Sequence, residues 1–170
     1  MFCEKVRSNV FLINNFSAAI NNTQFIFSTL WTNISAVNQW QIQQSMSDFQ
    51  VIQYNGERFS TIHANKLHQQ SRQFLNEALG AKSAGNKVIV THHVPSFLNY
   101  PEKYKGGVLN EAFAVELYDF IETHKPGYWI YGHHHYNTPD FKIADTQLLT
   151  NQLGYVRNAE NAGFNLGKVI

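Results

Sequence analysis

The chain has 170 residues, 44% of them hydrophobic and 14% aromatic, which predicts one globular domain with a substantial core. A formal net charge of +1, with 15% charged residues, gives no electrostatic reason to expect nucleic acid or an acidic membrane as a partner. No apolar run reaches the roughly twenty residues needed to cross a bilayer. The single Cys3 cannot form an internal disulfide, and no basic-then-apolar leader precedes it, so we expect a cytoplasmic protein.

The first third of the chain contains short apolar runs. Residues 9–14, 17–20 and 25–31 are separated by Asn-rich turns, a pattern that predicts three strands in a meander. Residues 35–49 carry a weaker apolar spacing among many Gln and Asn residues, which indicates a helix.

A clearer helix is predicted to begin at Ser60 or Thr61, either of which can act as its N-cap, and to end at Gly80. Its apolar stripe consists of residues at helical spacing: Leu67, Phe74, Leu75, Ala78 and Leu79. His63 and His68 lie outside this stripe. We therefore expect them to face solvent or the rim of a substrate site rather than to bind a metal.

Within residues 87–91, Val88, Ile89 and Val90 form a continuous apolar run between turn signals, as in a fully buried strand. His92 and His93 follow at its carboxyl end, where ligands gather in open α/β sheets. Pro95 ends the strand. Residues 97–110 are predicted to form a loop, for which a lid and a plain connection are both open interpretations.

A second helix is predicted after Asn110, its N-cap, with an apolar stripe made of Phe113, Leu117, Phe120 and Ile121. His124 falls in its last turn, where a partly charged ring favours the helix dipole. A strand over 128–131 follows, so the order is strand, helix, strand. Residues 141–150 then predict a hairpin, and residues 151–170 a polar tail.

Three consecutive histidines, His133, His134 and His135, follow the strand over 128–131. If the chain stays extended, His133 and His135 point to one side and His134 to the other, because side chains alternate along a strand. Gly132 allows a sharp turn or a close approach at this point. The pattern favours a metal site, and the alternative is an exposed polar patch at a strand end. A cloning tag is excluded by the internal position and the small number of histidines.

The two histidine clusters are expected to meet. When parallel strands are neighbours in a sheet, their carboxyl ends lie at the same edge, which would place His92 beside His133. Neutral imidazoles suit Zn, Fe, Mn or Ni better than calcium or magnesium, which prefer oxygen ligands.

Residues 90–96, Val-Thr-His-His-Val-Pro-Ser, and residues 129–135, Trp-Ile-Tyr-Gly-His-His-His, resemble the last two signature motifs of the calcineurin-like metallophosphoesterases. Residues 29–32 and 151–155 are similar to segments of one bacterial branch of that family, and the likeness runs from about Asn9 to Ile170. The resemblance implies an α/β fold, a four-layer α/β/β/α sandwich with two mixed sheets. It also implies a two-metal centre that activates a hydroxide for in-line attack on a phosphate mono- or diester.

Residue by residue, the resemblance implies that His92, His133 and His135 are metal ligands. The two histidines of the Gly-His-x-His motif, His133 and His135, would bind different ions. His93, His134 and Asn151 have no fixed ligand role and are candidates for substrate binding. No catalytic residue can be assigned.

The departures from the family pattern are as informative as the match. The sequence contains no Asp-x-His, Gly-Asp or Asn-His, the residues of the family's earlier motifs. Residues 1–170 are therefore expected to form a single domain that corresponds to the C-terminal portion of a phosphoesterase domain. Two ions close together need anionic ligands to offset their repulsion. We expect at most one ion here, on three histidines and water, and weak or no activity for the chain alone.

Three ways of completing the domain are open: a homo-oligomer, a separately encoded first half, or a truncated reading frame. The alternative function is a non-catalytic metal-binding or interaction module derived from the same fold. A further alternative is an unrelated α/β domain in which the histidines are incidental.

Overall fold

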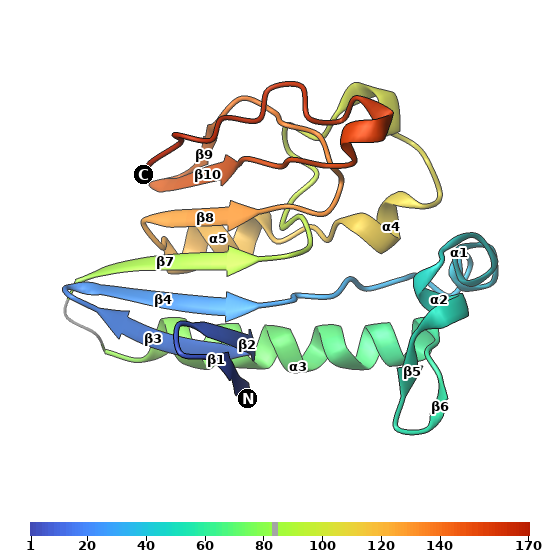
Figure 1. The fold of residues 1–170 in the computed structure, drawn as a ribbon, viewed down its shortest axis with the longest axis horizontal. Coiled ribbons are helices and arrows are strands. Elements are labelled where there is room, and N and C mark those ends of the chain that lie inside the picture. Colours follow the sequence, from blue (N-terminus) through green and yellow to red (C-terminus); the bar gives the residue numbers. More distant parts are fainter. Residues whose placement is uncertain (83–84) are drawn as a thin grey trace.

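The computed structural model describes residues 1–82 and 85–170, and it shows a mixed sheet flanked by helices (Figure 1), which confirms the α/β class. The strands are β1 (Phe2–Arg7), β2 (Val10–Asn14), β3 (Phe16–Ile20), β4 (Thr23–Ser28), β5 (Gln53–Tyr54), β6 (Glu57–Arg58), β7 (Asn86–Thr91), β8 (Tyr128–Tyr131), β9 (Phe141–Ile143) and β10 (Thr146–Thr150). The α-helices are α1 (Gln39–Ser45), α2 (Asp48–Val51), α3 (Thr61–Gly80), α4 (Asn110–Phe113) and α5 (Tyr118–His124), and short 3-10 turns span Glu102–Tyr104 and Val156–Asn158.

The main sheet has six strands in the order β3-β4-β7-β8-β10-β9. Its four central strands are parallel, and its two outer strands, β3 and β9, pair antiparallel with their neighbours. Strands β7 and β8 are direct neighbours, with Ile89 opposite Trp129. The predicted strand-helix-strand unit is therefore confirmed, and so is the hairpin of β9 and β10.

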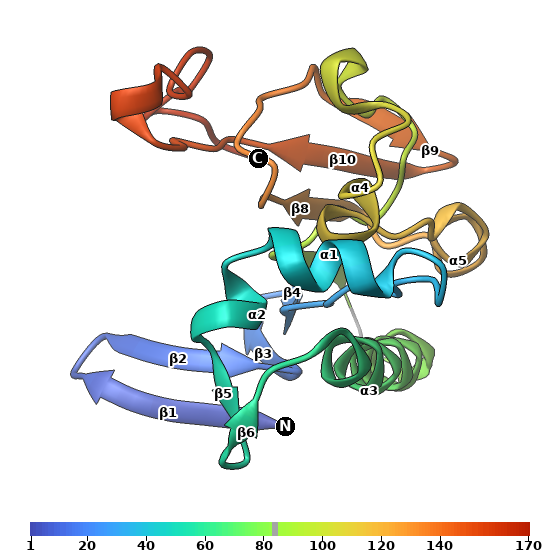
Figure 2. The same cartoon turned by 90° about the vertical axis from the view of Figure 1, so that its right-hand side faces the viewer.

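Helices α3 and α5 lie on the same side of this sheet (Figure 2). The core row beneath them runs across four strands in register and is at most 1% exposed: Ile26, Ile89, Trp129 and Leu148. Leu75 of α3 and Ile121 of α5, both fully buried, belong to the same cluster. Most of the predicted stripe residues thus pack against the sheet, whereas Leu67 and Phe113 pack in a second core.

A second, smaller core lies at the carboxyl ends of the strands, where α1, α2 and α4 gather (Figure 1). It is made of buried residues from these helices, from the start of α3 and from the connecting segments: Ile34, Ile42, Phe49, Phe59, Ala64 and Ala112. This core holds short helices against the edge of the sheet at which β7 and β8 end.

The N-terminal third differs from the prediction. β2 pairs with β1, which was not predicted, in a separate two-stranded sheet, so the three-stranded meander is wrong. β4 ends at Ser28 because Leu30 and Trp31 have positive φ angles of 69° and 34°. The single helix expected over residues 35–49 is two helices, α1 and α2.

The helix predicted after Asn110 is also two helices, α4 and α5. Ala114 is extended between them and forms an isolated β-bridge with Val94. Glu116 then accepts a hydrogen bond, at 2.9 Å, from the backbone N of Tyr118, the first residue of α5. Asn110 does not act as an N-cap, because its side-chain amide donates to the carbonyl oxygen of Tyr104.

Helix α3 begins and ends as predicted, and the Ser60 hydroxyl accepts a hydrogen bond from His63 N at 3.4 Å. The expectation for His68 is wrong, because its ring is only 8% exposed. His68 shares a helical face with Ser71 and Leu75, and its Nδ1 lies 3.0 Å from the carbonyl oxygen of Trp31. In the described ranges, no helix has both the length and the apolar character that crossing a membrane requires.

Candidate functional site

His92 and His133 meet at the carboxyl edge of the main sheet. His92 directly follows β7, and Gly132 and His133 directly follow the neighbouring β8. Gly132 N donates to His92 O at 3.2 Å, and the two imidazole rings lie 4.5 Å apart between centroids. The predicted convergence of the two clusters is confirmed for this pair.

The three histidines after β8 do not alternate as an extended strand would. β8 ends at Tyr131, and both His133 and His135 have left-handed backbone conformations, with φ angles of 76° and 51°. The expectation that His133 and His135 share one target is therefore wrong. A positive φ is uncommon for residues other than glycine, so this backbone path was not predictable from the residue pattern. The left-handed conformations are adopted by two histidines and not by Gly132.

His133 is turned towards the short helices. Its ring lies 4.4 Å from that of His93 and 4.5 Å from that of Phe113. Burial lowers the pKa of His133 to about 2, so the ring is neutral at ordinary pH. Its Nε2 atom is buried and has no hydrogen-bond partner within the described ranges. A neutral imidazole with an unpaired buried nitrogen has the donor character that a metal ion requires.

His92 and His93 differ in environment although they are adjacent. His92 is exposed, and partial desolvation lowers its pKa, against the opposing charge of Asp48. His93 is only 4% exposed, and burial lowers its pKa to about 3. The Nδ1 of His93 lies 2.9 Å from the carbonyl oxygen of Thr29, which makes this nitrogen the protonated donor. The His93 ring is thus fixed in the wall of the site, next to the rings of His92 and His133.

His134 points into the interior, where burial lowers its pKa to about 4. Its Nδ1 lies 2.9 Å from Nε2 of Gln152, whose amide nitrogen also lies near Tyr136 O and Thr150 Oγ1, at 3.1 and 2.8 Å. The Gln152 Oε1 accepts from His135 N at 2.8 Å. Gln152 therefore fixes the loop that follows β8, and sequence reasoning missed this residue.

His135 is paired with a carboxylate. Its Nδ1 lies 2.9 Å from Glu160 Oε2, and its ring meets Tyr155 edge-on at 4.7 Å between centroids. Glu160 also accepts from Tyr155 N at 2.7 Å, and this backbone hydrogen bond is the main cause of its lowered pKa. The pairing leaves Nε2 as the free nitrogen of His135, as in histidines whose orientation a carboxylate sets for metal binding.

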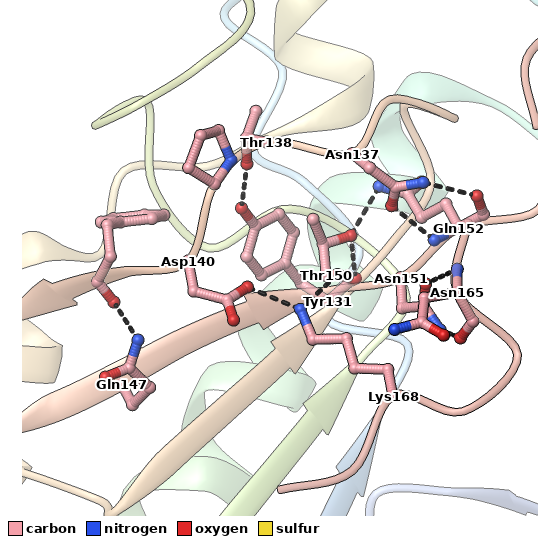
Figure 3. Close-up of polar contacts among 12 residues, drawn as sticks. Tyr131, Asn137, Thr138, Asp140, Gln147, Thr150, Asn151, Gln152, Asn165 and Lys168 are labelled. Atoms are coloured by element: carbon pink, nitrogen blue, oxygen red, sulfur yellow. Dashed lines mark hydrogen bonds and ion pairs between the residues drawn. The ribbon is translucent and has the colours of Figure 1, made fainter. Parts of the chain in front are cut away.

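Asn151 anchors the C-terminal tail. Its Oδ1 accepts from Asn165 N at 2.9 Å, and its Nδ2 donates to Asn165 O at 2.8 Å (Figure 3). Lys168 contacts Asp140 Oδ1 at 2.6 Å and Thr150 O at 3.0 Å in the same region. Asn151 does not line the cavity that the histidines share. Its role as a substrate-binding residue stays a prediction.

One cavity of about 540 Å³ joins the histidines of both clusters. His92, His133, His134 and His135 line it, together with the carboxylates of Asp48 and Glu160 and the aromatic side chains Tyr100, Tyr104, Phe113 and Tyr155. A smaller cavity of about 120 Å³ lies against it and is lined by Asp48, His92, His93 and His133 among others. The two carboxylates were not predicted, because no spacing in the sequence relates them to the histidine motifs.

The predicted metal ligands line the same cavity, but their side chains do not converge on one position within it. Among the described residues, no three His, Cys, Asp or Glu side chains are grouped closely enough, as they stand, to hold a metal ion. The structure brings His92 and His133 together and places His135 apart from them, against Glu160.

Comparison with known proteins gives one relative of undetermined function. The chain is 32% identical over 164 residues to the uncharacterized protein L509 of Acanthamoeba polyphaga mimivirus. The match covers 90% of this chain and 58% of the viral protein, so the chain spans less than two thirds of that relative's length. No protein-family model matches the chain, and no solved structure matches it.

Proposed function

We propose that the chain carries the later half of the site of a calcineurin-like metallophosphoesterase, an enzyme that hydrolyses phosphate mono- or diesters. The observation that carries this proposal is the pairing of His92 and His133 at the ends of neighbouring parallel strands, with ring centroids 4.5 Å apart. Both rings line the cavity of about 540 Å³ at that edge of the sheet. The motifs that resemble the family therefore lie together in space.

The chemistry of the pair fits a divalent transition metal such as Mn, Fe, Zn or Ni. Both imidazoles are neutral because desolvation lowers their pKa values, and His133 offers a buried Nε2 atom without a partner in the described chain. A bound ion would supply Lewis-acid activation of a phosphoryl oxygen and of the attacking water. The ends of β7 and β8 hold the rings of His92 and His133 in place, and this placement does not depend on a bound ion.

The position of His135 agrees with a role separate from that of His133, namely the binding of a different ion. The resemblance implies that the two histidines of the Gly-His-x-His motif bind different ions, and His135 is turned away from His133 towards Glu160. Glu160 orients the ring and leaves Nε2 free. We infer that His135 serves a second position in the same cavity, one that needs ligands from outside this chain.

The finer architecture, a four-layer sandwich, belongs to the same proposal. Helices cover one side of the main sheet (Figure 2), whereas several apolar side chains on the opposite side are only half-buried, although Val88 and Leu149 on that side are buried. The half-buried apolar residues include a row in register across three strands, Phe27 of β4, Val90 of β7 and Ile130 of β8, and also Phe25 of β4. An apolar sheet face of this kind suits a second sheet. We propose that this second sheet brings the missing carboxylates.

A non-catalytic metal-binding module is the second candidate. The absence of Asp-x-His, Gly-Asp and Asn-His from the sequence favours it, because the chain alone lacks the anionic ligands of a two-metal centre. Both candidates require His92 and His133 to bind an ion. They differ in whether phosphate-ester turnover depends on the same residues.

The test combines metal binding and turnover. Isothermal titration of the chain with Mn²⁺ or Ni²⁺ should show at most one ion bound, with binding lost in His92→Ala and His133→Ala. His63→Ala, half-buried at the start of α3, is the matched control and should bind like the parent. Hydrolysis of an aryl phosphodiester should be slow and should vanish in His133→Ala. Turnover that is absent, or independent of His133, would support the non-catalytic module, and a parent chain that binds no metal would contradict both.

A further inference from the structure

We propose that Asp48 supplies the carboxylate ligand of a divalent-cation site that it forms with His92 and His133. This inference rests on the proposed function for its two histidine ligands. It adds an anionic ligand that comes from this chain itself, from a helix unrelated to the histidine motifs.

The fold places Asp48 on the wall of the cavities that both rings line. Asp48 is the first residue of α2, and the next residue, Phe49, is 3% exposed and stacks on Phe59 at 5.5 Å between centroids. The backbone of Asp48 is therefore anchored in the small core at the carboxyl ends of the strands. Asp48, His92 and His133 line both the large and the small cavity. All three residues therefore lie where the two cavities adjoin.

The Asp48 carboxylate is free to bind. Asp48 is half-buried, and it forms no ion pair with any residue that the structure describes. A cation held between this carboxylate and the two rings would be attracted to it electrostatically.

The three groups form a donor set with a clear preference. Two neutral imidazoles and one carboxylate suit Mn, Fe and Zn ions, and the carboxylate supplies the negative charge that three histidines lack. The groups border one space but are not within ligation distance as they stand. Binding therefore requires the ion to draw the Asp48 side chain towards the rings, and no ion pair of Asp48 with a described residue opposes this movement.

The decisive experiment is Mn²⁺ titration of the full chain and of Asp48→Asn, a substitution that preserves shape and removes the charge. We expect Asp48→Asn to weaken Mn²⁺ binding by at least about tenfold, and His133→Ala to abolish it. Asp119→Asn, an exposed aspartate on α5, is the matched control and should bind like the parent. Circular dichroism of each variant checks that the fold is retained.

A spectroscopic measurement separates ligation from a long-range effect of charge. In the Co²⁺-loaded chain, Asp48→Asn should shift the visible absorption of the ion, because the ligand itself changes. An unchanged spectrum, or Mn²⁺ binding within about threefold of the parent, would overturn the role of Asp48. If His133→Ala still abolished binding in that case, the proposed function would stand without Asp48. A parent chain that binds neither ion would overturn both.

Discussion

The indole Nε1 of Trp129 donates a hydrogen bond of 3.0 Å to Thr91 Oγ1. It joins β8 to β7 at the residue immediately before His92, and the Thr91 hydroxyl in turn donates to His93 O at 2.8 Å. Trp129 is fully buried in the main core. The hydroxyl group of Thr91 thus links the core of the sheet to the backbone that carries His92 and His93.

Trp129→Phe should therefore destabilise the protein although it keeps an aromatic ring. We expect a loss of about 2 to 4 kcal/mol in the free energy of unfolding, from the smaller buried ring and from the lost hydrogen bond. Urea denaturation followed by circular dichroism measures this loss. Trp40→Phe, 77% exposed on α1, is the matched control and should change stability by less than about 0.5 kcal/mol. Equal effects of the two substitutions would contradict the assigned role of Trp129.

The meeting of His92 and His133 was predictable from the sequence. Apolar runs marked β7 and β8, and a helical stripe lay between them, so the rule for parallel neighbours placed both strand ends at one edge. The directions of His133 and His135 were not predictable, because left-handed backbone at histidine has no signature in the residue pattern.

Tertiary contacts also explain why the apolar periodicity predicted one helix where the structure has two. The apolar spacing of residues 113–121 fits one helix, but the β-bridge of Ala114 with Val94 interrupts it, and Glu116 accepts a hydrogen bond from the first backbone N of α5. Asp48 and Glu160 reach the cavity from segments distant in sequence. Residues of this kind can be found only once the segments that carry them are placed in three dimensions.

Gln152 is expected to matter more for stability than its position after the last strand suggests. Its buried side chain bonds to His135 N and His134 Nδ1, so Gln152→Ala would leave buried partners unpaired. We expect a loss of about 2 to 4 kcal/mol, measured by urea denaturation. Gln69→Ala, exposed on α3, should be nearly neutral, and a Gln152→Ala variant as stable as Gln69→Ala would refute the prediction.

The buried ring of His93 predicts a loss of stability in acid. Burial holds its pKa at about 3 in the folded chain, against an ordinary value of 6.5, so below pH 6.5 the unfolded chain binds a proton that the folded chain does not. The stability contributed by the neutral ring is complete above pH 6.5 and is lost as the pH falls towards 3. The expected slope is about 1.4 kcal/mol per pH unit for this residue.

His93→Asn should reduce this slope, because an amide can still donate to Thr29 O but does not titrate. Urea denaturation at several values between pH 6.5 and 4, with a chelator present, gives the free energy of unfolding for both proteins. The two curves should converge as the pH falls, even though the substitution itself lowers stability near neutral pH. Parallel curves would show that His93 does not remain neutral in the folded state.

Asn151 should act as an anchor of the C-terminal tail, through the two hydrogen bonds that it exchanges with the backbone of Asn165 (Figure 3). Asn151→Ala removes both, which should favour local opening of the tail by about 1 to 2 kcal/mol and so raise the rate of tryptic cleavage after Arg157 and Lys168 about 5- to 30-fold. Mass spectrometry of timed digests measures these rates. Asn161→Ala, an exposed residue of the same tail, is the control and should leave them unchanged. If Asn151→Ala were cleaved no faster than the parent while weakening a phosphate ester's binding, Asn151 would be a substrate-binding residue rather than an anchor.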